Sequence, residues 1–273
     1  MNISKNEKNQ AVAPESLMIE PTAFKDNQET ALYWLANAGA LINSNGTCIM
    51  IDPLLDCFDM PLLAKIPIPS SQVPHLDGVL ITHCDNDHFS RDTCRNLSGV
   101  TDTYHGPHYV KTLMDDLGLE SRGHDIGATF KIKNIDISLT PAKHNWQNES
   151  AKYGFRLFEE SDYCGYWIEM EDGTIWLPGD SRLLETHLEM PEPDVILFDF
   201  CDNPWHITLE GAITLANTYP NSDLVCIHWG SVDAPNMSPF NGNPEDLLGR
   251  VVNPGRIKVL APGEKYVLGP KGR

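Results

Sequence analysis

The stretch "VLITHCDNDHFS", residues 79–90, places two histidines and two aspartates between positions 83 and 88, directly after an apolar run. A solvated turn does not need histidines, and a buried core does not accept unpaired aspartates. Imidazole nitrogens and carboxylate oxygens together are the ligands that borderline and hard metal ions prefer. The stretch therefore predicts a metal-binding loop at the end of a short buried strand, "DGVLITH".

The same pattern returns elsewhere in the chain. Further apolar runs end in a single charged or imidazole side chain: "IMID" at Asp52, "SLTPAKH" at His144, "IWLPGD" at Asp180 and "LVCIH" at His228. Loops at strand ends are where α/β folds collect their functional residues. One strand-terminal histidine is usually structural, but five such places in one chain favour ligands that converge on one centre.

The spacing inside the dense stretch predicts two metal ions rather than one. In a turn that leaves a strand, His83 and Asp85 can point to one side while Asp87 and His88 point towards a second centre. A pair of metal ions can clamp a substrate oxygen and hold a deprotonated water between them. The sequence thus predicts a pair of metal ions, with a further histidine for each ion and one carboxylate between them.

Composition excludes several other functions. The formal net charge is −18, with 38 acidic against 20 basic residues and no basic cluster, which argues against a nucleic-acid partner. No apolar run approaches the roughly 20 residues of a transmembrane helix, and the first residues lack the apolar core of a secretory signal. Seven scattered cysteines without a CxxC pair predict reduced thiols in a cytoplasmic protein. Cys84 is expected to be a small buried apolar residue.

Element patterns predict an α/β fold with a pair of mixed sheets flanked by helices. Residues 1–28 are polar and are expected to form a flexible arm, followed by a single domain at 29–273. Asn45-Gly46 predicts a hairpin turn, and residues 106–119 and 208–220 predict helices, the second with Thr208 as its N-cap. Alternating apolar residues predict strands that include "KYGFRLFEE", residues 152–160.

The order and context of these motifs resemble the metallo-β-lactamase superfamily over about residues 30–268. The family's metal motif is His-x-His-x-Asp-His, and this chain offers His83-Cys84-Asp85-Asn86-Asp87-His88. The resemblance implies the family's αββα four-layer sandwich. It matches the family's later single ligands to His144, Asp180 and His228, and it gives Asp52 a supporting position beside the metals.

By this analogy, the first metal is held by His83, Asp85 and His144, the second by Asp87, His88 and His228, and Asp180 bridges them. The departure is Asp85, where the family pattern has histidine. A carboxylate adds a negative charge, which weakens the Lewis acidity of a divalent ion and favours manganese or iron over zinc. All three metals remain candidates for the two ions.

Within the superfamily, "YWLANAGALI…IDPLL", "HITLEGA" and "IHWG" resemble the ascorbate-6-phosphate lactonase and N-acylphosphatidylethanolamine phospholipase D types. The resemblance implies a hydrolase whose bridging hydroxide attacks an ester, lactone or phosphodiester of a small molecule. Its catalytic residues would be Asp180, Asp87 and His206. In these branches a histidine at the place of His206 lies near the substrate, where it orients an oxyanion or acts as general acid.

Two alternatives stay open. Superfamily members with a carboxylate ligand at the place of Asp85 resemble di-iron oxidoreductases, although they carry glutamate there and this chain has no room for the flavin domain of the flavodiiron proteins. Oxygen chemistry at a di-iron centre is therefore the second hypothesis. A metal-binding protein without turnover is the third.

The proline-rich loop at residues 60–75 carries Met60, Leu62, Leu63, Ile66 and Ile68. It predicts either an apolar lid that selects a substrate with a hydrophobic part, or a contact between copies in a homo-oligomer. Trp205 and Trp229 are candidates for pocket walls. The histidines without a partner pattern are expected to be structural or on the surface, namely His75, His105, His108, His124 and His187.

Overall fold

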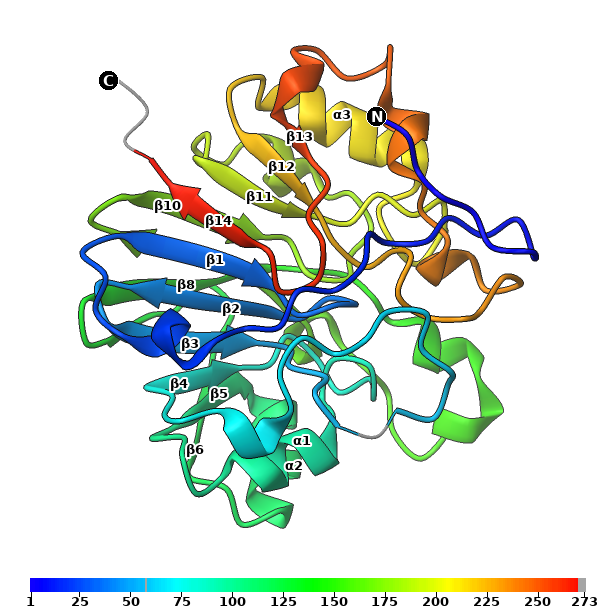
Figure 1. The fold of residues 1–273 in the computed structure, drawn as a ribbon. Helices are drawn as coiled ribbons and strands as arrows, with labels where there is room; N and C mark the ends of the chain where they lie inside the picture. Colours follow the sequence, from blue (N-terminus) through cyan, green and yellow to red (C-terminus); the bar gives the residue numbers. More distant parts are fainter. Residues whose placement is uncertain (57, 270–273) are drawn as a thin grey trace.

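Two seven-stranded sheets pack face to face in the computed structural model, which describes residues 1–56 and 58–269 (Figure 1). The first sheet has the strand order β14 (Lys265–Leu268), β1 (Thr30–Trp34), β2 (Ala40–Ser44), β3 (Thr47–Ile51), β4 (Gly78–Leu80), β5 (Tyr104–Pro107) and β6 (Ser121–His124). The second has the order β13 (Ile257–Lys258), β12 (Asp223–Cys226), β11 (Val195–Phe198), β10 (Gly173–Leu177), β9 (Cys164–Met170), β8 (Ile135–Pro141) and β7 (Thr129–Ile132).

Helices cover the outer faces of both sheets. The helices α1 (Arg91–Leu97) and α2 (His108–Asp116) pack on the first sheet, and α3 (Leu209–Thr218) lies beside β11 to β13 of the second (Figure 1). Both sheets mix parallel and antiparallel pairs. The predicted αββα sandwich of two mixed sheets is confirmed.

The strands β1 to β3 of the first sheet are largely apolar because both of their faces are covered. In β1 to β3 every residue is buried. Trp34, Ile42 and Ile51 join the core between the sheets, while Leu41 and Met50 join the core under the helices. Successive side chains of a strand point to opposite faces, so this alternation separates two cores rather than a core and solvent.

The fold brings the strand ends that carry the predicted histidine and aspartate residues to one end of the sandwich. The strands β3 and β4 run parallel in the first sheet, and β10, β11 and β12 run parallel in the second. Asp52, His83, Asp180 and His228 follow β3, β4, β10 and β12 respectively. Since the carboxyl ends of parallel strands meet at one edge of a sheet, these four side chains collect there.

Several element predictions are confirmed. Asn45 and Gly46 form the β2–β3 turn with φ of 49° and 87°, as an Asn-Gly hairpin requires. Helices α2 and α3 lie where they were expected, and the Thr208 side chain accepts a hydrogen bond from Gly211 N at 3.2 Å. Helix α1, capped by the Ser90 side chain, has no counterpart among the sequence predictions.

The strand predicted for residues 152–160 is wrong. This part of the chain forms short 3₁₀ turns at Ala151–Tyr153 and Glu160–Asp162. Its apolar residues do not face a sheet neighbour, and the side chains of Phe155 and Leu157 are 70% and 69% exposed. Alternation of apolar residues fits a strand only if a sheet edge is available to pair with it.

The first 28 residues pack against the domain. Ala11, Ala13 and Ile19 are buried, and Ala13 N donates to Gly230 O at 2.9 Å. The flexibility expected of this segment stays a prediction. Among the described residues, no helix is long and apolar enough to span a bilayer. The six described cysteines are free thiols; Cys57 and residues 270–273 of the predicted domain lie outside the described residues.

Candidate metal centre

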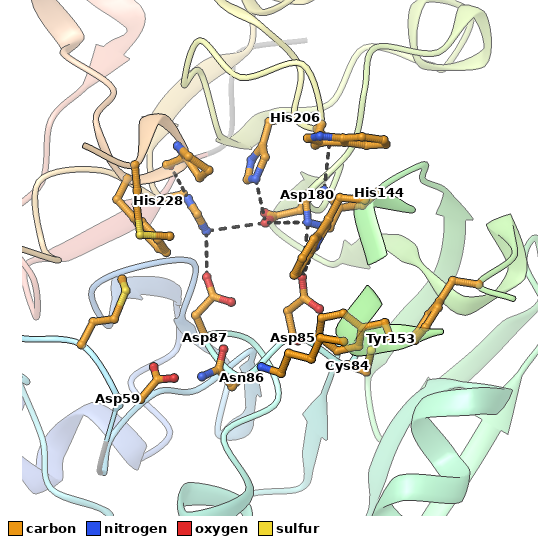
Figure 2. Close-up of a pocket in the computed structure, with 18 of the residues that line it drawn as sticks. Asp59, Cys84, Asp85, Asn86, Asp87, His144, Tyr153, Asp180, His206 and His228 are labelled. Carbon is orange, nitrogen blue, oxygen red and sulfur yellow. Dashed lines mark hydrogen bonds and ion pairs between the residues drawn. The ribbon is translucent and has the colours of Figure 1, made fainter. Parts of the chain in front are cut away.

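Seven residues predicted as metal ligands line or border one buried centre, together with His206 (Figure 2). Asp180 lies in the middle of them. Its Oδ2 atom is 3.1 Å from His88 Nε2, 3.6 Å from His228 Nε2 and 3.9 Å from His144 Nε2. The geometry therefore gathers side chains that follow three other strands around one carboxylate oxygen.

The remaining ligand candidates divide into two groups on either side of Asp180. In one group, Asp85 Oδ2 is 3.4 Å from both His83 Nε2 and His144 Nε2. In the other, Asp87 Oδ2 is 3.6 Å from His88 Nε2 and 3.4 Å from His228 Nε2. The potential ligand atoms of each group lie within 4.8 Å of one another. This division is the one expected from the spacing of the stretch at residues 83–88.

Each histidine has its outer ring nitrogen next to a hydrogen-bonding partner. The Nδ1 atom of His88 is 2.8 Å from Asp52 Oδ2, that of His144 is 2.9 Å from Trp205 O, and that of His228 is 3.0 Å from Pro239 O. These acceptors require the proton on Nδ1, which leaves the lone pair of Nε2 facing the centre. Such outer partners fix the tautomer and orientation of metal-ligating histidines.

His83 is held by a relay to the same aspartate. Its Nδ1 is 3.0 Å from Thr82 Oγ1, and Thr82 Oγ1 donates to Asp52 Oδ2 at 2.6 Å. Asp52 Oδ1 also accepts from Thr82 N at 2.8 Å. Asp52 thus orients His83 and His88 together while lying outside both ligand groups.

The inner nitrogens are buried without a hydrogen-bond partner among the described residues. This holds for the Nε2 atoms of His83, His88 and His228. A buried imidazole lone pair without a donor is costly unless something else satisfies it. Imidazole nitrogen and carboxylate oxygen are also the donors that zinc, manganese and iron accept. The residues present therefore fit a metal centre.

The charges of the buried carboxylates and histidines also suit a metal centre. Burial lowers the pKa of His228, but the negative charge of Asp180 and the contact with Asp87 outweigh it and raise the pKa to about 9. Burial raises the pKa of Asp87, yet His88 and His228 lower it to about 2. In the same way, burial opposes ionisation of Asp180, and the surrounding histidines hold its pKa well below the usual range. Carboxylates kept ionised this deep need cationic partners, which protons on histidine or metal ions provide.

Asp85, the departure from the family pattern, is fixed by two donors. Trp146 Nε1 donates to Asp85 Oδ2 at 2.8 Å, and Gln147 Nε2 donates to Asp85 Oδ1 at 2.6 Å. Gln147 Oε1 in turn accepts from the Tyr163 hydroxyl at 2.6 Å. This network builds the site for a carboxylate, because an imidazole cannot accept both hydrogen bonds.

The backbone turns sharply where the side chains enter the centre. Asp52 and His228 adopt the left-handed region with φ of 42° and 61°, directly after β3 and β12. Gly179, directly before Asp180, has a φ of 74°, and a Cβ atom there would lie 2.6 Å from Cys164 O. Left-handed residues of this kind collect at functional sites, where the surrounding structure holds the strain.

His206, predicted as catalytic, faces the centre as well. Its Nε2 lies 3.4 Å from Asp180 Oδ2, and its Nδ1 lies 2.6 Å from Asp199 Oδ2. Burial raises the pKa of Asp199, but the neighbouring His206 lowers it overall. Asp199 ends the apolar run of β11 as Asp52 ends that of β3, so the strand-end pattern could have identified it.

Asn37, like Asp199, supports the centre but was not predicted from the sequence. Its carbonyl accepts from His228 N at 2.8 Å, and its Nδ2 donates to Asp87 O at 3.0 Å. It lies in the β1–β2 turn with a φ of 46°. Asn37 joins the loops that follow β4 and β12, so it holds Asp87 and His228 in register. Nothing in "ANAG" alone indicates this long-range role.

The centre opens into a cavity of about 690 Å³. Trp205 forms part of its wall and stacks under Arg182, whose guanidinium carbon is 4.2 Å from the ring centroid. Trp229 does not line the cavity; it is buried and stacked on Trp34 at 6.2 Å between centroids. Cys84 is half-buried at the cavity rather than in the core, and burial raises its thiol pKa to about 12.

Of the described residues of the proline-rich loop, Met60 at its start lines the cavity, next to Phe58 and Asp59, which precede the loop. Leu62 pairs with Val232 in an isolated bridge, and Leu63 N donates to Ser231 O at 2.8 Å. Ile68 is buried in the core under the helices. The loop is therefore anchored along most of its length.

The histidines without a partner pattern lie away from the centre. His105 and His187 are buried, the first stacked between other rings and the second 2.8 Å from Pro141 O. His124 is half-buried beside His105, with 3.0 Å between their ring nitrogens, while His75 and His108 are exposed.

The chain is similar to known proteins in both sequence and fold. A family model described as the beta-lactamase superfamily domain matches residues 47–229. A metal-dependent hydrolase of Sulfurisphaera tokodaii is 24% identical over 247 residues, which cover 87% of this chain and 99% of the relative.

Solved structures share the fold at low identity. An isothiocyanate hydrolase from Delia radicum gut bacteria superposes with a TM-score of 0.70 at 19% identity and covers 88% of this chain and 99% of its own. The di-iron β-hydroxylase CmlA of Streptomyces venezuelae gives a TM-score of 0.59 at 13% identity, over 88% of this chain and 54% of the hydroxylase. The match of the family model to most of the chain, on a fold with this arrangement of strand-end residues, means that the protein belongs to the beta-lactamase superfamily.

Proposed function

We propose that this protein is a metal-dependent hydrolase that binds two metal ions side by side and cleaves an ester, lactone or phosphodiester bond of a small molecule. The single observation that carries the proposal is the orientation of the imidazoles. His83, His88, His144 and His228 each have Nδ1 beside an outer partner and Nε2 facing the carboxylates of the centre. Relatives that span nearly the same length are named metal-dependent hydrolases, which supports the reaction class.

His83, Asp85 and His144 would hold the first ion, and Asp87, His88 and His228 would hold the second. Asp180 lies within reach of both groups and would bridge them. When bound, such a pair of ions would lower the pKa of water so that it can attack at neutral pH, and would polarise the oxygen of the bond to be cleaved. The surrounding histidines hold the pKa values of Asp180 and Asp87 low, so both carboxylates stay ionised and can bind metal.

His206 would donate a proton to the leaving group. Its Nε2 faces the cavity beside Asp180, and Asp199 fixes the ring through Nδ1. A protonated His206 can donate from Nε2 to an alcohol or phosphate ester oxygen as the bond breaks. Asp52 and Thr82 act one layer further out, where they keep His83 and His88 in the tautomer that binds metal.

The test of this proposal is metal content followed by turnover. We expect about two ions per chain by element analysis of purified protein, and hydrolysis of chromogenic esters without oxygen or reductant. His88→Ala and Asp180→Ala should each lose bound metal and lower kcat/KM by more than the roughly 10–100-fold that loss of an outer partner costs.

The matched control is His108→Ala, which removes a histidine whose side chain is 63% exposed, pairs with Asp125 and does not line the cavity. It should keep metal content and turnover. A His88→Ala or Asp180→Ala variant with full metal content and full activity would contradict the proposal.

Asp85 favours one second candidate, oxygen chemistry at a di-iron centre. Three carboxylates with four imidazoles form a ligand set hard enough for iron. A visible absorption spectrum of the purified protein separates the two candidates, because zinc and manganese(II) centres are nearly colourless. Turnover that requires both oxygen and a reductant would favour the oxidative function over hydrolysis.

A further inference from the structure

One segment, residues 145–158, provides most of an apolar wall beside the metal centre. Trp146, Tyr153, Phe155 and Phe158 all line the cavity. Their ring centroids lie 5.2 Å apart for Trp146 and Tyr153, 6.0 Å for Tyr153 and Phe158, and 6.1 Å for Phe155 and Phe158. These four residues form a connected surface, which we call the aromatic wall. Tyr153 lies on the Asp85 side of the cavity (Figure 2).

The aromatic wall runs from a buried ring, Phe158, through the half-buried Trp146 and Tyr153 to Phe155, which is open to solvent. The side chain of Phe155 is 70% exposed although it borders a cavity. A large exposed ring beside a concave site marks a surface that a ligand covers. Across the cavity, Phe58, Met60 and Met237 supply further apolar surface. Methionine side chains adapt to ligands of different shape.

The cations of this region are poorly placed to bind an anion. Arg91 and Lys152 line the cavity, but both are exposed, so water and salt screen their charges. Arg156 packs behind the aromatic wall, where it donates to Asp162 Oδ2 at 2.6 Å and lies 3.6 Å from the ring centroid of Tyr109. The exposed carboxylate of Asp59 at the cavity adds a negative charge.

Asp85 also removes the positive charge that the centre would otherwise present. With two divalent ions bound, the negative charges of Asp85, Asp87, Asp180 and one hydroxide would together balance the four positive charges of the ions. With histidine in place of Asp85, the same centre would carry one net positive charge. An anionic substrate therefore gains no net attraction from the centre of this protein.

From these observations we propose that the substrate is an electrically neutral ester or lactone with an aryl or alkyl group, and not a phosphodiester or another anion. The apolar group packs on the aromatic wall while the carbonyl faces Asp180 and His206. This inference rests on the proposed hydrolytic function. In the reaction, the oxygen of one water forms a bond to the carbonyl carbon and the bond from that carbon to the alcohol oxygen breaks. One proton of the water goes to the alcohol oxygen, and the other passes to solvent as the acid leaves as a carboxylate.

Two pairs of probes of matched shape test the charge preference on the metal-loaded protein. The first pair is 4-nitrophenyl butyrate and the mono-4-nitrophenyl ester of succinic acid, which share a leaving group and differ in one carboxylate. We expect kcat/KM to be at least about tenfold higher for the butyrate. Bis(4-nitrophenyl) phosphate should be a poorer substrate still.

The second pair measures binding without turnover. Butyranilide and succinanilic acid carry an amide in place of the ester, and isothermal titration calorimetry gives their Kd values. Butyranilide should bind at least about tenfold more tightly. Phe155→Ala should weaken its binding several-fold, whereas Leu157→Ala should not, because Leu157 is equally exposed at 69% but does not line the cavity.

The Asp85→His variant tests the charge argument directly. If it still binds two metal ions, its preference should move towards the succinate ester and succinanilic acid.

Each outcome separates the two proposals. Turnover or binding that favours the anionic member of a pair overturns the neutral-substrate inference and leaves hydrolysis standing. Binding of butyranilide at the aromatic wall without turnover of any ester supports the inference about the ligand and counts against the hydrolytic function. If neither anilide binds, or if Phe155→Ala and Leu157→Ala have equal effects, the aromatic wall is not the binding surface.

Discussion

At the scale of single residues, the centre depends on how each imidazole divides its two nitrogens between an outer partner and the cavity. Asp52 is the most connected of the outer partners, since it accepts from Thr82 N, Thr82 Oγ1 and His88 Nδ1. Asp199 has the same relation to His206. Both aspartates follow a strand, but they orient different imidazoles. Asp52 orients His88, which belongs to a ligand group, whereas Asp199 orients His206, which lies beside the ligand groups.

This difference predicts opposite phenotypes for two matched substitutions. Asp52→Asn should lower metal affinity by roughly 10–100-fold, because the amide cannot accept from both Thr82 and His88 as the carboxylate does. The left-handed φ of 42° at this position suits asparagine, so the fold should survive. Asp199→Asn should keep the metal and lower kcat by roughly 10–100-fold through loss of His206 orientation.

Metal affinity from competition with a chromogenic chelator and kcat from the ester assay measure the two effects. A loss of metal in Asp199→Asn with none in Asp52→Asn would reverse the assignment of outer partners.

At the scale of elements, short connections position the site more than the strands do. Asp77, directly before β4, accepts from Cys48 N of β3 at 2.7 Å and from Lys133 Nζ at 2.5 Å. Lys133 lies in the β7–β8 turn of the other sheet, with a φ of 47°. One buried carboxylate therefore ties the strand that leads to His83 to its neighbour β3 in the same sheet and to the β7–β8 turn of the other sheet.

We expect the stability of this tie to depend on pH in a defined direction. Burial raises the pKa of Asp77, but hydrogen bonds from Lys133 and from Cys48 N outweigh it, so the folded-state pKa lies below the ordinary value of 3.8. A lowered folded pKa stabilises the folded state above pH 3.8, and this contribution is lost as the pH falls through the folded value.

Asp77→Asn should therefore reduce the free energy of unfolding by about 1–2 kcal/mol at pH 7. Urea denaturation at pH 7 and at about pH 3 measures the difference between the wild type and the variant. The difference should shrink at the lower pH. An equal difference at both pH values would show that Asp77 acts without its charge.

At the scale of the whole molecule, the two sheets meet at the centre and share its charges. Asp52, His83, Asp85, Asp87 and His88 come from the first sheet and its loops, whereas His144, Asp180, Asp199 and His228 come from the second. Their carboxylates are buried close together, which destabilises the folded chain unless positive charge accompanies them. Metal ions that bind here would link the sheets as well as catalyse.

Removal of metal should therefore destabilise the entire domain. A chelator should lower the Tm by on the order of 10 °C, since a ligand present at about 1,000 times its Kd contributes roughly 4 kcal/mol to folding stability. Differential scanning calorimetry measures the shift, and a chelator already saturated with calcium provides the control. Added zinc or manganese should restore the original Tm. A Tm that chelation does not change would mean that the folded state does not depend on bound metal.

The sequence by itself determined which kind of fold the chain adopts and which imidazoles and carboxylates gather at one end of it. Residues 83–88 and the single strand-end residues Asp52, His144, Asp180 and His228 stand out because imidazoles and carboxylates recur at the ends of five apolar runs. The hairpin at Asn45-Gly46 and the helices α2 and α3 follow from local backbone preferences. These signals are local, so a single sequence contains them.

Only the tertiary structure decided which partners surround these residues and what the apolar residues near them do. The contacts of Asn37 with Asp87 and of Trp146 and Gln147 with Asp85 join segments that are far apart in the sequence. Residues 152–160 have the alternation of a strand, yet they border the cavity because no sheet edge pairs with them. Pairing and burial depend on the arrangement of all other elements, and the pattern of one segment does not contain that arrangement.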